Sequence, residues 1–191
     1  MMIDVAKNPF VPLETWENTR VTLKEGDETR EVDAKQYRIR YLVGESDDRR
    51  FIDTGEDRIG AASQTTLHLV NSIHKLSGDP FHYNMGAVES ITGNAMTTEN
   101  TKKLVRHAAC SDHSTIEVIF ESPGIQCCAM TKEEANRKEA PLQYISGYLL
   151  GKSNNLLKIA LSKTVTDSGL EYYDHVHVIP EPAIKQWACL E

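Results

Sequence analysis

Two histidines stand two residues apart in the stretch LEYYDHVHVIPEPAI, which spans residues 170–184. If this stretch is a β-strand, His175 and His177 point to the same face, and that geometry suits Zn²⁺. A third ligand would have to come from elsewhere, for example Asp112 or His113. The alternative is a barrel strand without a metal. Its half-exposed face would carry Tyr173, His175 and His177, and its buried face would carry Tyr172, Val176 and Val178. We favour this alternative.

Four arginines are the best candidates for an anion-binding site in the first half of the chain. Arg38 and Arg40 alternate along the stretch 35–43, so they share one face of a strand, and Arg49 and Arg50 begin a stretch that we expect to return beside it. Guanidinium groups bind phosphate or carboxylate through forked pairs of N–H donors. The alternative is cross-strand pairing with the acids of the same region, which are Glu45, Asp47, Asp48, Asp53 and Asp57.

Other reactive side chains lack the spacing of an active site. The stretch HAACSDH, residues 107–113, matches no zinc-binding pattern, and no histidine stands at a fixed spacing from Cys127. The chain has no P-loop, no GxGxxG, no HExxH and no GxSxG. We therefore lean against an enzyme and expect no cofactor and no catalytic residue.

Composition excludes some classes of partner. The net charge is −7, so the chain lacks the basic surface that a general duplex binder needs to neutralise phosphates. No apolar run approaches the roughly 18 residues of a membrane helix, and the N-terminal stretch does not read as a signal peptide. The four cysteines form no CxxC, and we expect them to be free thiols in a reducing compartment. These features together predict a cytoplasmic protein.

The pattern of residues 1–110 indicates a domain that mixes strands and helices. Leu69, Ile73 and Leu76 fall on one face of a helix, with Ser63 as its N-cap. The expected elements are a hairpin over 19–32, a strand over 35–43, a turn over 44–48, a short return strand over 49–54, and helices over 63–78 and 97–110.

The pattern of residues 111–191 indicates an almost all-β domain. Thr131 and Glu134 have the spacing of a capping box, so we expect a short surface helix within 131–140. Short strands joined by tight turns are typical of a small closed barrel. The expected strands cover 115–122, 125–130, 142–152, 155–165, 170–179 and 184–190.

Four features of this second part follow one another along the chain. They are a bent strand with Gly147, the polar turn 152–155, an aliphatic strand that ends in Leu161-Ser162, and a strand that ends in Ile179-Pro180. In this order they resemble the small Sm-like barrel of short phage and bacterial proteins. The resemblance covers roughly residues 115–190 and implies a small Sm-like β-barrel there. Together with the mixed pattern of residues 1–110, this predicts an α+β fold in which a mixed N-terminal part precedes the barrel.

The histidine pair carries a second, partial resemblance. The signature of histidine-triad nucleotide hydrolases alternates three histidines along a strand, and here Tyr173, His175 and His177 occupy those positions. The resemblance implies that His177 would be the nucleophile. This gives the alternative function of a histidine-dependent nucleotide phosphoesterase or metal hydrolase centred on His175 and His177.

The leading hypothesis is a non-catalytic binding or sequestering protein, such as an accessory factor of a phage or mobile element. Its partner would be a protein or a small anionic ligand such as a nucleotide, and neither duplex nucleic acid nor a membrane is expected. The phosphate would bind Arg38, Arg40, Arg49 and Arg50, and Tyr172 or Tyr173 would stack on the base. Small barrels bury few apolar residues and associate edge to edge, so we also expect a homo-oligomer.

Overall fold

The computed structural model describes residues 10–25, 27–53, 59–75, 83–85, 88–92, 100–107, 115–122, 131–137 and 140–191. These residues form almost only β-strands, with one short α-helix, α1 (Lys132–Asn136), and a 3-10 helix, Glu181–Ala183. The strands are β1 (Val11–Glu25), β2 (Glu28–Asp53), β3 (Ile59–Val70), β4 (Ser72–Lys75), β5 (Tyr83–Met85), β6 (Glu89–Thr92), β7 (Thr101–Lys103), β8 (Arg106–His107), β9 (Thr115–Glu121), β10 (Leu142–Ser153), β11 (Leu156–Thr166), β12 (Glu171–Pro180) and β13 (Ile184–Leu190). The predicted α+β class is therefore wrong, and the chain is nearly all antiparallel β.

All of these strands belong to one branched antiparallel sheet. Its main path is β6-β3-β2-β11-β10-β9-β13-β8, with β1 on β2, β7 on β1, β12 on β11, β4 on β10 and β5 on β4. Three pairings join the two predicted parts of the chain, namely β2 with β11, β4 with β10, and β8 with β13. The predicted division near residue 110 therefore does not divide the sheet.

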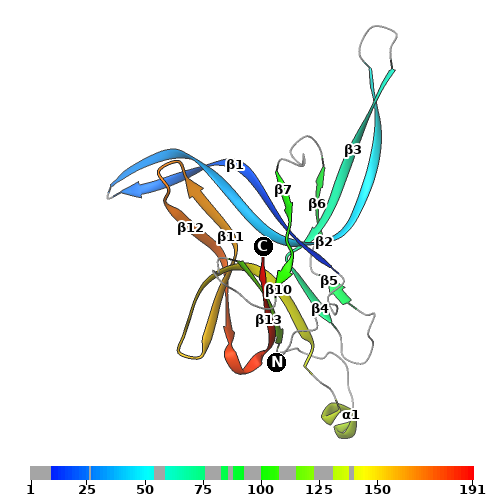
Figure 1. The fold of residues 1–191 in the computed structure, drawn as a ribbon, viewed down its shortest axis with the longest axis vertical. Helices are drawn as coiled ribbons and strands as arrows, with labels where there is room; N and C mark the ends of the chain where they lie inside the picture. Colours follow the sequence, from blue (N-terminus) through cyan, green and yellow to red (C-terminus); the bar gives the residue numbers. More distant parts are fainter. Residues whose placement is uncertain are drawn as a thin grey trace.

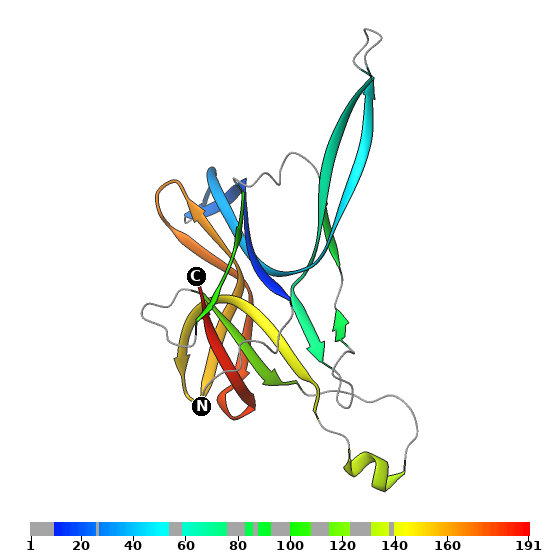
Figure 2. The ribbon, with the colours of Figure 1, turned by 45° about the vertical axis from the view of Figure 1, so that its right-hand side comes forward.

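The long strand β2 organises the first part of the chain. It turns back from β1 with Glu25 opposite Glu28, which confirms the predicted hairpin. It then continues through residues 44–53, where we had predicted a turn and a short return strand; both predictions are wrong, because the return strand is β3. The β2–β3 ribbon extends away from the rest of the molecule in both ribbon views (Figures 1 and 2).

The two predicted helices of the first part are strands wherever the structure describes them. Within 63–78 the chain forms the end of β3 and all of β4, with a bend at Asn71 between them. Leu69 and Ile73 are both fully buried, but in two different strands, so their spacing of four reflects the bend and not a helical turn. Within 97–110 the described residues form β7 and β8.

The second part follows its sequence prediction closely. The strands β9, β10, β11, β12 and β13 lie within a residue of the expected bounds, and Thr131 and Glu134 form the expected capping box on α1. Asn154 and Asn155 have φ of 52° and 59°, as the tight turn between β10 and β11 requires. The predicted strand 125–130 lies outside the described residues.

Five strands wrap around the largest core cluster. Their order is β13-β9-β10-β11-β12, which is compatible with a small barrel, although no pairing between described residues joins β12 to β13. The cluster draws side chains from all five strands: Ile116, Val118, Phe120, Ile145, Leu157, Ile159, Leu161, Ile179 and Cys189. A Cβ atom at Gly147 would lie 2.2 Å from the Ala160 carbonyl oxygen, so glycine lets β11 approach the bend in β10.

Cys189 corrects the prediction that all four cysteines are free thiols. It is the one cysteine among the described residues, and it is disulfide-bonded rather than a free thiol. Disulfides persist mainly in oxidising compartments, so cysteine usage gives no support to the predicted reducing compartment. Within the part of the chain that the structure describes, no helix is long and apolar enough to cross a membrane.

Candidate ligand-binding face

The predicted histidine pair lies on the edge strand β12. His175 is exposed and has a left-handed backbone with φ of 54°, whereas His177 is partly buried. Burial lowers the pKa of His177, and the neighbouring His175 lowers it further. Among the described residues no three His, Cys, Asp or Glu side chains are grouped closely enough to hold a metal ion. The proposed third ligands, Asp112 and His113, lie outside the described residues.

The exposed face of β12 is the one that the sequence pattern predicted to be buried. The sequence pattern predicts that Tyr172, Val176 and Val178 are buried, but Val176 is 46% exposed and Val178 is 51% exposed. The barrel core is instead reached by Ile179, which is on the other face together with the partly buried His177. The predicted alternation of two faces along β12 is therefore correct, but the prediction of which face packs against the core is wrong.

The arginines at positions 38 and 40 are held by carboxylates. Arg40 is buried, donates to Glu89 at 2.6 Å and to Thr15 at 2.7 Å, and burial lowers its pKa although Glu89 opposes this. Arg38 donates to Gln36 and lies 3.7 Å from the other oxygen of Glu89. These contacts match the alternative of pairing with acids, although the partner Glu89 comes from another strand than the acids we had named.

The other two arginines are remote from this pair. Arg49 and Arg50 lie opposite Ser63 and Ala62 in the projecting β2–β3 ribbon. Arg49 stands nine positions after Arg40 in the extended strand β2, which is about 30 Å along the strand at about 3.3 Å per residue. The structure therefore does not bring the four arginines together.

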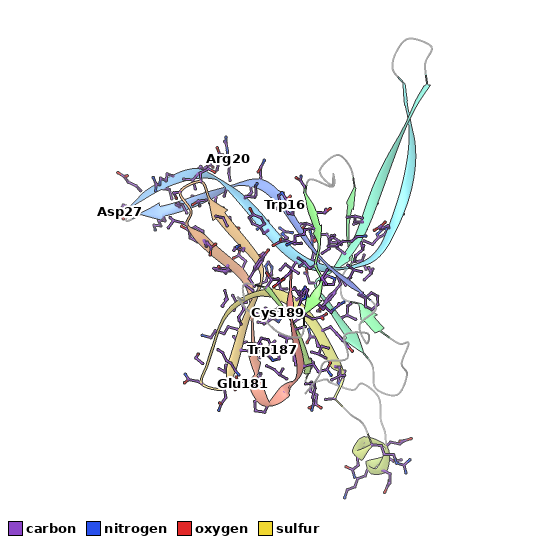
Figure 3. The ribbon with its side chains drawn as sticks, viewed as in Figure 1. Trp16, Arg20, Asp27, Glu181, Trp187 and Cys189 are labelled. Atoms are coloured by element: carbon purple, nitrogen blue, oxygen red, sulfur yellow. The ribbon has the colours of Figure 1, made fainter. Side chains whose placement is uncertain are left out.

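A row of aromatic and basic side chains crosses four neighbouring strands. Trp16 of β1 is opposite Tyr37 of β2, Tyr37 is opposite Lys163 of β11, and Lys163 is opposite Tyr173 of β12. Directly opposite residues in antiparallel strands share a face, so these four side chains form one line across the sheet. We call Trp16, Tyr37, Lys163 and Tyr173 the aromatic row. Figure 3 labels Trp16 at its β1 end.

The Lys163 ammonium lies at the centre of this row. It is 5.7 Å from the centroid of the Tyr37 ring and 5.2 Å from that of Tyr148. Both distances allow cation–π attraction. The Trp16 and Tyr37 rings are 6.3 Å apart, and the Tyr148 and Tyr173 rings are 6.5 Å apart. The lysine is therefore surrounded by aromatic surface contributed by several strands.

Two carboxylates, Glu171 and Glu14, flank the aromatic row. Glu171 accepts a hydrogen bond of 2.5 Å from the Tyr173 hydroxyl and lies 3.5 Å from the Lys163 ammonium. The tyrosine hydrogen bond, followed by the lysine charge, lowers the pKa of Glu171, and the same hydrogen bond raises the pKa of Tyr173 to about 12. On the other side, the Tyr148 hydroxyl donates to Glu14 at 2.7 Å. Burial, followed by Glu14, raises the pKa of Tyr148.

Sequence reasoning found one member of the aromatic row and missed the rest. Tyr173 was proposed for base stacking, and it lies in the row; Tyr172 was proposed as well, but it lies on the opposite face of β12. Trp16, Tyr37 and Lys163 were missed because they become neighbours only through the register of β1, β2 and β11. The one local signal was an aromatic residue at an alternating position in each of three strand-like stretches.

Comparisons of the chain with known protein families, with curated proteins and with solved structures find no match. The resemblances to Sm-like barrels and to histidine-triad hydrolases therefore stay predictions.

Proposed function

We propose that this is a non-catalytic binding protein that works as a homo-oligomer, with the exposed strand β12 as its contact surface. The observation that carries the proposal is the clustering of exposed apolar side chains there. Half of the large apolar side chains that are exposed in the described residues fall within residues 170–178: Leu170, Tyr172, Tyr173, Val176 and Val178. Tyr172, Val176 and Val178 share one face of β12, and an exposed apolar patch of this kind marks an interaction site.

The backbone of β12 supports the same use. Its inner edge pairs with β11 along nearly its whole length, and no other strand among the described residues pairs with its outer edge. An exposed edge offers unpaired N–H and C=O groups to a strand of another chain. A second copy of this chain is the expected occupant because the apolar core formed by the described residues is divided into three small clusters, and small cores are often completed by oligomerisation.

The other predicted functions are supported by a sequence resemblance alone. An origin in a phage or mobile element has the Sm-like resemblance as its sole support. A nucleotide-hydrolysing centre at His175 and His177 has the histidine-triad resemblance as its sole support, and no contact of the described residues favours it over binding.

Light scattering coupled to size-exclusion chromatography tests the proposal. The wild type is expected to elute as a defined oligomer, and the double variant Val176→Lys, Val178→Lys is expected to weaken self-association at least about tenfold, since it removes apolar burial and adds charge. Val105→Lys changes an equally exposed valine outside β12 and serves as the control. A wild type that stays monomeric at about 100 μM, beyond the affinity of most specific oligomers, would contradict the proposal.

A further inference from the structure

We infer that the aromatic row is a binding site for a mononucleotide, whose base stacks on the aromatic rings and whose phosphate is held by Lys163 and Lys35. This site goes beyond the proposed function, since it does not depend on self-association. Tyr172, Val176 and Val178 of the proposed contact surface lie on the opposite face of β12 from the row, and Tyr173 is the one residue that the two surfaces share.

The rings of the row provide a surface for a planar ligand. Trp16 and Tyr37 are partly exposed, Tyr173 is exposed, and they come from three strands of one sheet. Nucleobases of every kind present a π-face, so stacking on such rings binds them with little sequence preference. The buried Tyr148 ring has its centroid 5.2 Å from the Lys163 ammonium, and its hydroxyl donates a hydrogen bond to Glu14.

Two lysines are placed to share one phosphate. Lys35 lies opposite Val165, one step along the same face from the pair of Tyr37 and Lys163. Lys35 and Lys163 are therefore diagonal neighbours on adjacent strands, a separation that long side chains can bridge. Lys35 makes no ion pair with any residue in the described ranges.

The carboxylate beside Lys163 leaves its ammonium open to a second anion. Glu171 is bonded at 2.5 Å by the Tyr173 hydroxyl, whereas its distance to the ammonium is 3.5 Å, which is long for a charged hydrogen bond. The tyrosine therefore fixes Glu171 independently of the lysine. The Lys163 side chain is 21% exposed, so a phosphate oxygen can reach its ammonium from solvent.

The surrounding charges select the size of the ligand. Glu14 and Glu171 border the row, and the nearby Arg20 is already paired with Asp33 at 2.9 Å. Two lysines against two carboxylates favour a ligand with one phosphate over a polyphosphate. The net charge of −7 likewise disfavours a nucleic acid strand.

The test uses the full chain and three probes: adenosine monophosphate, adenosine and inorganic phosphate. A Trp187→Phe background leaves Trp16 as the fluorescent reporter, because Trp187 lies away from the row on β13 (Figure 3). The monophosphate is expected to quench Trp16 saturably, and calorimetry is expected to give the same affinity. Adenosine and phosphate alone are each expected to bind at least about tenfold more weakly, because each makes half of the contacts.

Variants locate the phosphate contact. Lys163→Gln and Lys35→Glu are each expected to weaken binding of the monophosphate about tenfold or more, since each removes a charged contact. Lys35→Glu keeps the test valid if Lys163→Gln disturbs the packing of the tyrosines. Lys158→Gln is the matched control, because Lys158 is an exposed lysine of the same strand β11 outside the row.

Three outcomes would overturn the inference. The first is the absence of saturable quenching and of heat with millimolar monophosphate. The second is monophosphate binding that neither Lys163→Gln nor Lys35→Glu weakens. The third is equal affinity for adenosine and its monophosphate, which would mean that the row holds a ring without holding a phosphate.

Discussion

Two carboxylates in this protein are each held by a tyrosine hydroxyl and a cation, yet they differ in almost every physical respect. Glu117 on β9 is 3% exposed and accepts from Tyr41 at 2.8 Å and from Arg106 at 2.5 Å and 3.1 Å. The side chain of Glu171 on β12 is 44% exposed and is bonded by Tyr173, with Lys163 at 3.5 Å. We call them the closed and the open carboxylate.

The difference teaches what burial does to one set of chemical groups. Around the closed carboxylate, the arginine fork binds both oxygens and also donates to the carbonyl of Phe10. One buried charge therefore joins β2, β8, β9 and the residue that precedes β1. Burial, followed by Glu117, raises the pKa of Tyr41 well above its ordinary value, which keeps the hydroxyl a donor. Around the open carboxylate the lysine is a point charge with water nearby, so it is free to change partner.

The largest effect is expected from opening the closed carboxylate. Arg106→Leu would remove the arginine that forms an ion pair with the buried Glu117, and loss of one partner of a buried ion pair typically costs about 3–5 kcal/mol of folding free energy. Urea unfolding followed by circular dichroism measures the loss.

The control for this prediction removes the whole pair. In the double variant Arg106→Leu, Glu117→Leu no buried charge remains unpaired, so much of the lost stability is expected to return. If Arg106→Leu alone costs less than about 1 kcal/mol, the closed carboxylate does not hold the strands together as described.

A matched pair of tyrosine variants sharpens the comparison. Tyr41→Phe leaves a buried carboxylate oxygen with one donor fewer, which is expected to cost about 1–3 kcal/mol. Tyr173→Phe removes a bond that water can replace, and a surface change of this kind is expected to stay within about 0.5 kcal/mol. Equal losses in the two variants, measured by the same urea titration, would show that burial does not separate the two carboxylates.

How far the sequence could predict this molecule follows from the range of each interaction. The turn at Asn154 and Asn155 and the capping box at Thr131 are local, so residue type alone identified them. The helix predicted over 63–78 failed because the spacing of Leu69 and Ile73 has two explanations, a helical turn or two buried strands joined by a bend. Tertiary pairing with β2 and β10 decided for the strands.

The two carboxylates show the limit for functional sites. The closed group joins residues 41, 106 and 117, and the aromatic row beside the open group joins residues 16, 37, 163 and 173, so neither has a fixed spacing in the chain. The row is defined by the registers of three strand pairs, namely β1 with β2, β2 with β11, and β11 with β12. Sequence could indicate that Tyr173 is on a half-exposed strand, but not which lysine lies opposite it.

Alkaline titration provides a measure of the open carboxylate itself. Tyr173 is expected to ionise near pH 12, because its hydroxyl donates to Glu171. In Glu171→Gln the acceptor is neutral, so the pKa of Tyr173 is expected to fall toward its ordinary value of about 10. The difference in absorbance at about 295 nm between each protein and its Tyr173→Phe variant isolates this ionisation. An unchanged difference curve would mean that Glu171 does not hold the hydroxyl.

The smallest effect is expected on stability at acidic pH, where two titratable groups of β12 act in different pH ranges. Burial, followed by His175, lowers the pKa of His177. Between this lowered pKa and about 6.5, the unfolded chain therefore binds more protons than the folded chain. The stability of the fold falls as the pH drops through this range. The lowered pKa of Glu171 has an effect of the same sign at lower pH. The stability that Glu171 contributes is fully present above about pH 4.5 and is lost as the pH falls further.

Urea unfolding at a series of pH values separates these two contributions. His177→Gln is expected to remove the slope just below pH 6.5, and Glu171→Gln to remove the slope below about 4.5 without touching the first. His175→Asn is the informative control, since asparagine tolerates the left-handed backbone of position 175 and removes only the second cause of the His177 shift. It should therefore reduce the first slope without abolishing it. A first slope that survives unchanged in His177→Gln would mean that another group produces it, and it would contradict a pKa of His177 that burial in the folded chain lowers.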